Sequence, residues 1–327
     1  MAATAELHTT TGTLTPQPPF DWAKTLAFYA GFPPTSAEQT IADGALTKAI
    51  TVDGRAVAFT VWSAEKAHNE DTEDTEGRRG ETARSDVETP RLEYRFVSER
   101  ALTATERAAL EDRVGFFLSI GDDPRPFYAL AEADPVFAPV ARRLYGLHQP
   151  KFLTPFENAA WAVLTQRTPM PMARQAKDRL IARYGTAITV AGVTYRAFPE
   201  PATLAAAEVA DLGSEVGAER KGEYLRAVAE FFAETDEDEL RHGDYDQVAA
   251  RLRAVRGLGP WSAGFVLIRG LGRTERVIGP ERALAEAAGR LYGAGHALSE
   301  PDLRALFDRY GPYQGYWAFY VRNASLA

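Results

Sequence analysis

The 327-residue sequence predicts an α+β fold, in which an N-terminal antiparallel sheet domain with covering helices precedes a two-part, all-helical region. Two observations support this prediction. Within residues 45–98, three segments are rich in β-branched and aromatic residues, as strands are. From residue 120 onward, apolar residues recur at the three- and four-residue spacing of helices, with Pro and Gly between the segments. At this length two or three domains are expected.

The N-terminal α+β domain is predicted over residues 16–120. Asp21 suits the N-cap of a helix that runs through Phe32, and an Asp53-Gly54 turn joins the strands ALTKAITVDG and RAVAFTVW. LEYRFVS adds another strand, and residues 103–117 a helix. Residues 1–15 are rich in Thr and Ala and are expected to form a disordered tail. Residues 66–88 hold eight acidic residues against four basic ones, which predicts a disordered acidic insertion.

The remainder of the chain is predicted to form two helical domains. One is a middle helical domain at residues 151–245, and the other combines residues 121–150 with residues 246–327. The acidic segment at residues 234–246 is expected to be a linker. Helices are predicted over residues 124–132, 136–145, 155–166, 170–184, 201–210, 219–234, 244–255, 260–271, 280–292, 299–309 and 312–324.

Residues 252–272 predict two helices joined by a tight hairpin. A turn bounded by Gly257 and Gly259 leaves backbone N–H groups unscreened, and Pro260 suits the first position of the second helix. Such N–H groups, together with the positive end of the helix dipole, can bind a DNA phosphate without reading sequence. The predicted phosphate-binding hairpin comprises Gly257, Leu258, Gly259, Trp261 and Ser262.

Two other interpretations of the hairpin are available. A dinucleotide-binding loop is disfavoured, because the preceding segment is an Arg-rich helix and not a strand. A glycine-linked helix pair that only packs is the second. Charge favours DNA over packing alone: residues 251–290 hold eight Arg and three Glu, a net of 8 − 3 = +5, in a chain whose total is −8.

Five blocks of the chain resemble a known family, in the same order. They are QPPFDW (17–22), residues 125–167, residues 198–208 with 217–225, RGLGPWSAGFVLIRGLG (256–272) and YGPYQGYWAFYVR (310–322). These blocks resemble the helix-hairpin-helix superfamily of DNA glycosylases and are closest to its 3-methyladenine DNA glycosylase II family. The resemblance runs from about residue 16 to the C-terminus. It implies a two-part helix-hairpin-helix core and an enzyme that flips and excises alkylated bases from double-stranded DNA in base excision repair.

The family's catalytic position is occupied by a different acid. A catalytic Asp follows the second hairpin helix in this superfamily, and here Glu281 stands at the matching place. A carboxylate there would stabilise positive charge on the sugar and orient water, although a displacement of ~1 Å can cost ~100-fold in rate. One alternative is that Glu281 only stabilises the start of its helix. Another is a catalytically weak or inactive damaged-DNA-binding protein that keeps the fold without the usual Asp.

A second position bears on the type of chemistry. Related glycosylases that also cut the backbone carry a Lys in the second hairpin helix, where this chain has Trp261. An indole cannot form an imine, so the resemblance implies a monofunctional, water-using enzyme without lyase activity.

The resemblance also implies positions for base recognition. Trp261 and Phe265 match residues near the lesion pocket, whereas the rings between residues 313 and 320 are expected to be mostly core. Gln166 and Arg167 match the wedge that fills the gap left by the extruded base. The alternative for Arg167 is a solvated loop residue that caps its helix.

Composition limits cofactors and location. Without Cys there is no thiolate for an iron–sulfur cluster or a disulfide, and the five His lack ligand spacing, so no metal bound by side chains and no cofactor are expected. The family's hairpin carbonyls can, however, hold a monovalent cation. We expect a monomer that binds damaged double-stranded DNA. The lack of an apolar span and of a signal sequence predicts a cytoplasmic protein, which would be nucleoid-associated if bacterial.

Overall fold

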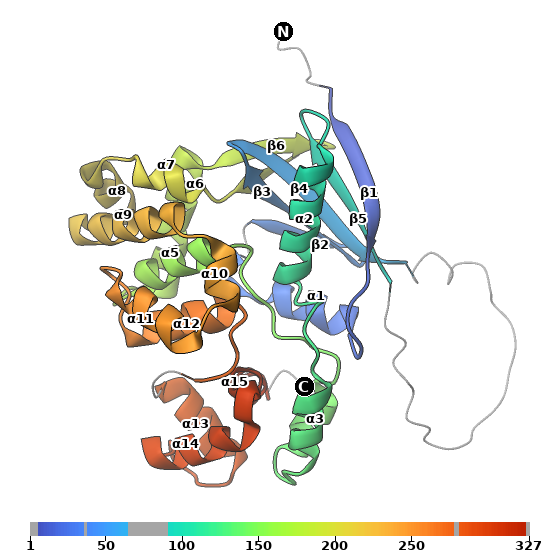
Figure 1. The fold of residues 1–327 in the computed structure, drawn as a ribbon, viewed down its shortest axis with the longest axis vertical. Helices are drawn as coiled ribbons and strands as arrows, with labels where there is room; N and C mark the ends of the chain where they lie inside the picture. The colour runs from blue at the N-terminus through green and yellow to red at the C-terminus, as the bar shows by residue number, and fades with distance from the viewer. Residues whose placement is uncertain (1–5, 36–37, 65–90, 278–280, 325–327) are drawn as a thin grey trace, which may run out of the picture.

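A five-stranded antiparallel sheet forms one side of the molecule in the computed structural model, which describes residues 6–35, 38–64, 91–277 and 281–324 (Figure 1). Its strands lie in the order β1-β5-β4-β3-β2. The strands are β1 (His8–Leu14), β2 (Gln39–Ala42), β3 (Ala45–Val52), β4 (Arg55–Ser63) and β5 (Leu92–Ser98). Asp53 and Gly54 both have positive φ and form the tight turn between β3 and β4, as predicted. The predicted acidic insertion at residues 66–88 lies outside the described residues.

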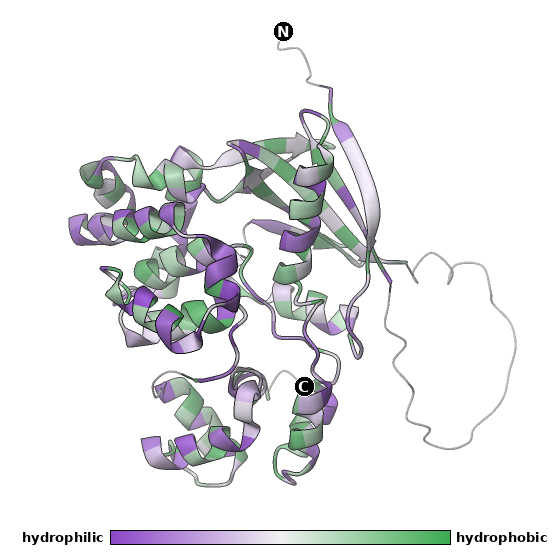
Figure 2. Ribbon diagram, in the orientation of Figure 1, coloured by the Kyte–Doolittle hydropathy of each residue, from purple (hydrophilic) through white to green (hydrophobic). Residues whose placement is uncertain are grey.

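The predicted disordered tail over residues 1–15 is wrong for the part that the structure describes. His8–Leu14 pair with β5 in register from His8↔Ser98 to Leu14↔Leu92. Figure 2 shows β1 as a pale strand, because its Thr side chains are neither strongly hydrophobic nor strongly hydrophilic. Thr has a high β propensity, and β5 offers an open edge of backbone groups to pair with. The partner strand lies about eighty residues away in sequence, so local composition did not predict the pairing.

Two helices cover one face of the sheet. They are α1 (Trp22–Ala30) and α2 (Ala104–Phe117). Asp21 caps α1 by accepting a hydrogen bond from the Lys24 N–H, which confirms the predicted helix start. Val57, Phe59 and Val61 of β4 are fully buried in the cluster beneath these helices. Alternation along the strand places the small residues of β4 on the opposite face.

That opposite face is covered by a β-hairpin, which corrects the prediction of an all-helical region after residue 120. β6 (Thr186–Val190) and β7 (Val193–Ala197) form a two-stranded sheet. Ile188 and Ala197 pack against Ala49 and Ala58 of the large sheet. The Ala191-Gly192 turn has positive φ at both residues, the signature of a two-residue hairpin loop. The β-branched residues and this turn were the missed local signal.

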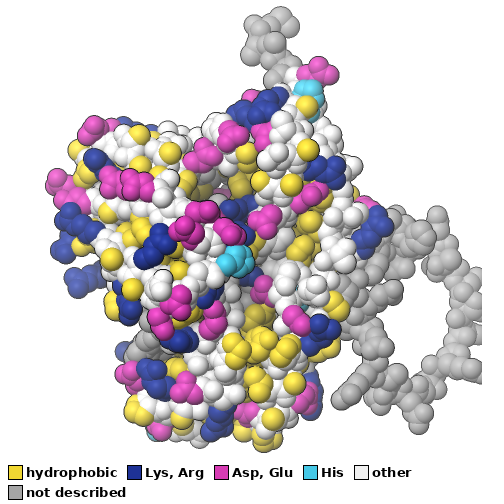
Figure 3. Space-filling view, in the orientation of Figure 1, with side chains coloured by type: hydrophobic (Ala, Val, Ile, Leu, Met, Phe, Trp, Pro, Cys, Tyr) yellow, Lys and Arg dark blue, Asp and Glu magenta, His cyan; other side chains and the backbone are white. Residues whose placement is uncertain are grey.

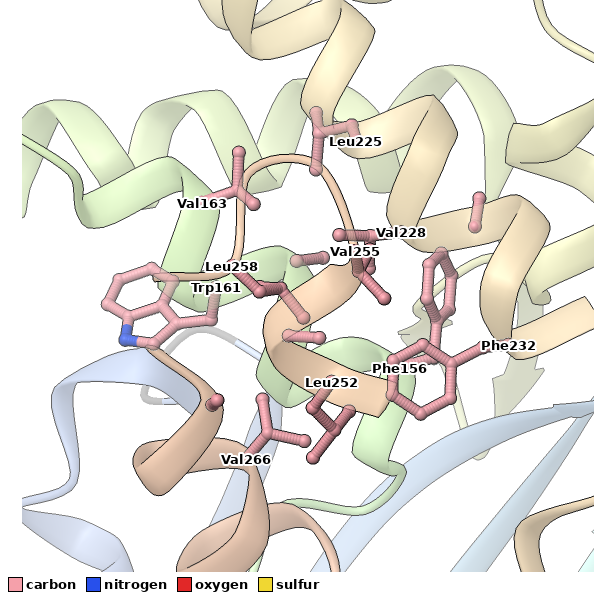
Figure 4. Packing of buried hydrophobic residues seen from close by; sticks show 14 of the residues in the cluster. Phe156, Trp161, Val163, Leu225, Val228, Phe232, Leu252, Val255, Leu258 and Val266 are labelled. Carbon is pink, nitrogen blue, oxygen red and sulfur yellow. The ribbon is translucent and has the colours of Figure 1, made fainter. Parts of the chain in front are cut away.

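The first helical unit has one apolar core that includes both hairpin helices (Figure 4). The predicted boundary at residue 245 therefore differs from the packing, in which this core continues to Leu271. The predicted acidic linker contains helix α10, and the helix predicted over 201–210 is divided into α7 and α8. The helices are α5 (Pro155–Thr165), α6 (Met170–Tyr184), α7 (Pro201–Ala205), α8 (Val209–Val216), α9 (Glu219–Glu234), α10 (Glu237–His242), α11 (Tyr245–Ala254) and α12 (Pro260–Gly270).

The second helical unit combines two separate parts of the chain. Residues 127–147 and 277–321 share one apolar cluster, in which the C-terminal rings are mostly buried. Its helices are α3 (Arg125–Glu132), α4 (Ala138–Arg143), α13 (Arg282–Leu291), α14 (Glu300–Phe307) and α15 (Gln314–Arg322), with a short 3-10 helix at Asp308–Tyr313 between α14 and α15. Another short 3-10 helix, Pro33–Thr35, follows α1.

Buried charges join the sheet domain to the first helical unit. Lys177 of α6 is paired with Glu38 and, at 2.6 Å, with Glu157 of α5, while Lys48 of β3 also pairs with Glu38 at 2.6 Å. Burial opposes ionisation of Glu38, but the charges of Lys177 and Lys48 more than offset it and lower the pKa of its carboxyl. These pairs lie at the interface between the two units.

Candidate active site and nucleic-acid interface

The predicted hairpin joins α11 to α12 through residues 255–259. Gly257 has a φ of +100°, and a Cβ there would lie 2.6 Å from the Cβ of Tyr224 on α9, so only glycine fits. A Cβ on Gly259 would meet nothing within 4 Å, which leaves its backbone open to an approaching molecule. Figure 4 shows Leu258 and Val255 pointing into the core near Leu225 and Val228.

The side chains of two predicted hairpin residues are therefore not available to a partner. Leu258 and Ser262 are both buried. What remains exposed is backbone: α12 begins after Gly259 without a side-chain cap, so its first N–H groups lack partners within the helix. Arg220 and Arg256 lie over the Tyr224 ring beside this turn and are exposed. Sequence reasoning did not single out Arg220, which comes from a different helix.

The loop after α5 lies directly against the hairpin. Gln166 Nε2 donates a hydrogen bond of 2.7 Å to the carbonyl oxygen of Gly257. Arg167 follows with a φ of +50° and an exposed side chain. A positive φ at a non-glycine residue stores backbone strain, which is concentrated at functional sites. The two residues predicted as the wedge and the predicted phosphate-binding turn are thus neighbours.

Lys221 of α9 holds this loop in place. Its Nζ donates to the Leu164 carbonyl at 2.6 Å and to the Thr168 hydroxyl. Lys221, and not Arg167, therefore satisfies this carbonyl at the end of α5. Burial lowers the pKa of the Lys221 ammonium. Met170 and Met172, at the start of α6, are exposed beside the same loop and were not predicted as site residues.

Trp261 and Phe265 form a stacked pair on α12. Their ring centroids are 5.2 Å apart with an interplanar angle of 13°. Phe265 packs edge-on against Phe152, at 5.8 Å, whereas Trp261 is 44% exposed. Phe265 is fixed by the core, and Trp261 presents an aromatic surface on which a flat ring can stack.

A cavity of about 40 Å³ brings the predicted pocket and catalytic residues together. It is lined by Trp261, Gly264, Phe265, Ile268, Arg269, Val277, Glu281 and Arg322. These residues come from α12, the connector after it, the start of α13 and the end of α15. Trp261, Phe265 and Glu281, which the family resemblance assigned to the lesion pocket and to catalysis, therefore lie close together in space.

Glu281 lies at the N-cap position of α13, but its side chain does not cap the helix. Its carboxylate instead forms an ion pair with Arg322 Nη2, while its backbone carbonyl accepts from Ala285 N–H at 2.9 Å. The side chain is 29% exposed and lines the cavity. Arg322 follows forty-one residues later, and no local pattern indicated that the two side chains meet.

Besides Arg322, the cavity is lined by a second basic residue, Arg269. It was counted among the DNA-facing arginines, but its side chain is buried. Burial lowers the pKa of its guanidinium to about 10; Tyr29 opposes this shift and the charge of Arg322 adds to it. It therefore stays protonated near neutral pH.

The basic region predicted over residues 251–290 is weaker than its composition suggests. Arg251 pairs with Glu239, Arg256 with Glu223 and Arg276 with Asp246. All three acids lie outside that stretch of sequence. On the face shown in Figure 3, basic and acidic side chains are interspersed rather than separated. The positive charge of this stretch is therefore partly neutralised by acids from other parts of the chain.

No three His, Asp or Glu side chains within the described ranges lie close enough together to hold a metal ion. In those same ranges, no helix is long and apolar enough to cross a membrane.

Comparison with known proteins gives both sequence and fold relatives. No protein-family model matches the chain. A DNA-3-methyladenine glycosylase of Bacillus subtilis is 30% identical over 155 residues, 47% of this chain and 51% of that protein. A protein of the same name from Saccharomyces cerevisiae is 31% identical over 131 residues, 38% of this chain and 42% of that protein. The aligned segments thus span about half or less of these relatives.

Fold similarity extends over nearly the whole chain. The structure of a 3-methyladenine DNA-glycosylase from Archaeoglobus fulgidus has a TM-score of 0.73 at 21% identity, with 96% of this chain and 97% of that chain covered. A Clostridium acetobutylicum 8-oxoguanine glycosylase/lyase, in complex with double-stranded DNA, has a TM-score of 0.63 at 13% identity, with 96% of each chain covered. The α+β architecture with a helix-hairpin-helix is therefore shared with these structures.

Proposed function

Since this chain belongs to the helix-hairpin-helix DNA glycosylase superfamily, we propose that it is a monofunctional DNA N-glycosylase that excises alkylated bases from double-stranded DNA in base excision repair. The observation that carries the proposal is the cavity along α12 and at the start of α13, which Trp261, Phe265 and Glu281 line together. A carboxylate beside an exposed aromatic surface is what excision of a flipped base requires.

In this proposal the hairpin binds the DNA backbone, and the loop after α5 fills the gap that the extruded base leaves. Backbone N–H groups at the start of α12 bind one phosphate, and Arg220 adds charge beside them, whereas Arg256 is paired with Glu223. Arg167 enters the gap in the base stack, where its guanidinium plane stacks on neighbouring bases. The Gln166–Gly257 hydrogen bond fixes the distance between these two contacts.

In the chemical step, the extruded base stacks on Trp261 and the sugar lies near Glu281. As the bond between sugar carbon and base nitrogen breaks, the carboxylate stabilises the positive charge that develops on the sugar. The departing base takes the electron pair of the broken bond, and a water molecule adds its oxygen to that carbon. One proton of the water stays on the new hydroxyl and the other is released, to solvent where the alkylated base departs neutral, which leaves an abasic site. Arg322 orients the carboxylate through the ion pair.

The cavity must widen before a base can enter. A volume of about 40 Å³ accommodates water-sized contents and not a purine. The two side chains at its rim that are exposed enough to move are Trp261 and Arg322.

A second candidate function is binding of damaged DNA without efficient excision. The Glu281–Arg322 ion pair favours it, because a carboxylate already paired with a cation stabilises a second positive charge less. Both candidates use the same hairpin and aromatic pair.

The test is release of free base from alkylated duplex DNA by the purified full-length protein, with product strands analysed separately. We expect free alkylated base and unbroken strands that carry abasic sites. Tight and lesion-selective binding without base release would support the second candidate. A protein that neither releases base nor binds lesion DNA selectively would contradict both candidate functions.

A further inference from the structure

Arg322 lies at the rim of the cavity with most of its hydrogen-bond donors unused. Its Nη2 donates to Glu281, and this is the one hydrogen bond that its guanidinium makes within the described ranges. A guanidinium carries several more N–H donors than that. The side chain is 40% exposed, while Tyr320 and Val321 just before it are buried in the core of the second helical unit. A fixed backbone therefore presents a cation at the rim, with donors available to a ligand.

The charged side chains that line the cavity carry two positive charges and one negative charge. Glu281 and Arg322 neutralise each other in their ion pair, and Arg269 is buried with Nε and Nη2 unpaired within the described residues. Burial lowers the pKa of the Arg269 guanidinium and the charge of Arg322 lowers it further, so the two cations are neighbours. Purines alkylated at a ring nitrogen carry a formal positive charge in DNA. The proposed substrate therefore needs an additional anion beside this cavity.

Duplex DNA brings that anion with the extruded nucleotide. A phosphate flanks each sugar on either side, so a sugar that lies against Glu281 keeps both of its phosphates close to the rim of the cavity. The carboxylate would repel a phosphate there unless a cation stood between them. Arg322 is such a cation, because it is bonded to the carboxylate and exposed at the rim. The planar fork of guanidinium donors also matches the oxygens of a phosphate.

We propose, on the basis of the glycosylase function proposed above, that Arg322 is a DNA phosphate-binding residue that bridges Glu281 and one of the two phosphates flanking the extruded nucleotide. Nη2 keeps its bond to the carboxylate, and the other donors bind the phosphate. The bound phosphate offsets the charge of Arg322. The charge of Glu281 then remains effective toward a cationic base and toward the positive charge that develops on the sugar.

Neutral phosphates test this contact. A methylphosphonate keeps the shape of a phosphate and removes its negative charge. It is placed at either flanking phosphate, or several nucleotides away as a control, in a duplex with tetrahydrofuran, an abasic-site analogue that has no base to release. Affinity is measured for full-length wild type, Arg322→Met and Arg304→Met. Arg304 is exposed on α14 and paired with Glu300, which makes it the matched control.

One flanking methylphosphonate should weaken wild-type binding by ~10-fold, the loss expected for one charge-assisted hydrogen bond. Arg322→Met should bind the charged and the neutral duplex with affinities within about twofold of each other, and Arg304→Met should respond like the wild type. Arg322→Met should also lower the slope of log affinity against log salt concentration by about one, since one phosphate contact is lost. A role confined to holding Glu281 would change neither measurement. Thermal melting checks that each variant is folded.

Excision tests the effect on the carboxylate. The same methylphosphonate in a duplex with 7-methylguanine should slow single-turnover excision by the wild type by ~10-fold, because Arg322 then cancels the charge of Glu281 again. The decrease should be smaller in Glu281→Gln, which has no carboxylate charge to cancel. An equal decrease in both proteins would overturn the effect on Glu281.

Two further outcomes overturn the inference while the proposed function stands. One is wild-type binding that neither flanking methylphosphonate weakens. The other is an equal weakening in the wild type and in folded Arg322→Met. If Arg322→Met does not fold, Arg322→Gln takes its place. Release of no base from the 7-methylguanine duplex overturns the proposed function instead, and binding to the tetrahydrofuran duplex still decides whether Arg322 contacts the phosphate.

Discussion

Gln166 and Gly257 connect two segments that lie ninety-one residues apart, through a 2.7 Å hydrogen bond from a side-chain amide to a backbone carbonyl. Gln166 ends α5 and precedes the strained Arg167, while Gly257 is the tightest point of the hairpin. This polar contact links the loop of Arg167 to the hairpin backbone, whereas the bonds of Lys221 to Leu164 and Thr168 hold the same loop to α9. Such a contact can be removed without disturbing the apolar core beneath it.

Gln166→Ala should therefore reduce excision more than it reduces stability. The substitution leaves the Gly257 carbonyl to water and lets the loop after α5 shift, and a displacement of ~1 Å can cost ~100-fold in rate. The expected result is a loss of 10-fold or more in single-turnover excision, with a free energy of unfolding lowered by only about 1 kcal/mol. A variant with unchanged excision would show that the two loops act independently. Gln247→Ala, at an exposed position on α11, is the matched control.

Replacing Glu281 tests the carboxylate. Glu281→Gln keeps the shape of the side chain and removes its charge, so lesion binding should persist while excision falls by ~100-fold or more. Glu281→Asp tests whether the length of the acidic side chain suits excision. The excision rate falls if Glu281 already places its carboxylate at the best position, and it rises if the shorter Asp of the family places the negative charge better. Equal excision rates for the parent and both variants would mean that Glu281 only begins α13.

Borohydride reduction tests for lyase chemistry. Trp261 cannot form an imine, and no lysine is among the described residues that line the cavity. Reduction in the presence of lesion DNA should therefore trap no covalent complex. A trapped complex that disappears on substitution of one nearby lysine, such as Lys221, would contradict the monofunctional proposal.

Acid should weaken the junction between the sheet domain and the first helical unit. The folded-state pKa of the Glu38 carboxyl is held below its ordinary value by Lys177 and Lys48, so its stabilising contribution is present above that ordinary value and is lost as the pH falls through the lower folded-state pKa. Glu38→Gln should lower the free energy of unfolding at neutral pH by about 3–5 kcal/mol, because it leaves buried lysines with less compensation.

The pH dependence gives the sharper comparison. Urea unfolding at several pH values below 5 should show a steeper loss of stability for the wild type than for Glu38→Gln, since the variant has no carboxyl to protonate at this position. Glu99→Gln, at an exposed position after β5, should follow the wild type. Identical slopes for all three proteins would show that Glu38 does not titrate with unfolding.

Local sequence patterns determined those elements whose signals lie within a few residues of one another. Asp21 begins α1 because its side chain can accept from the N–H three residues later, and Asp53-Gly54 turns the chain because both residues tolerate positive φ. α6 and α9 have the predicted limits because apolar spacing and helix ends are local properties. Family resemblance, and not spacing, indicated that Trp261, Phe265 and Glu281 belong together.

Only the tertiary structure decided the contacts made between distant segments. β1 is a strand because β5 offers it backbone partners, and Arg322 reaches Glu281 because α15 packs against α13. Arg269 lies in the cavity and not on the exposed surface, because rings from α1 and α15 enclose it. Charge and exposure at such positions depend on which parts of the chain become neighbours, and neither composition nor periodicity carries that information.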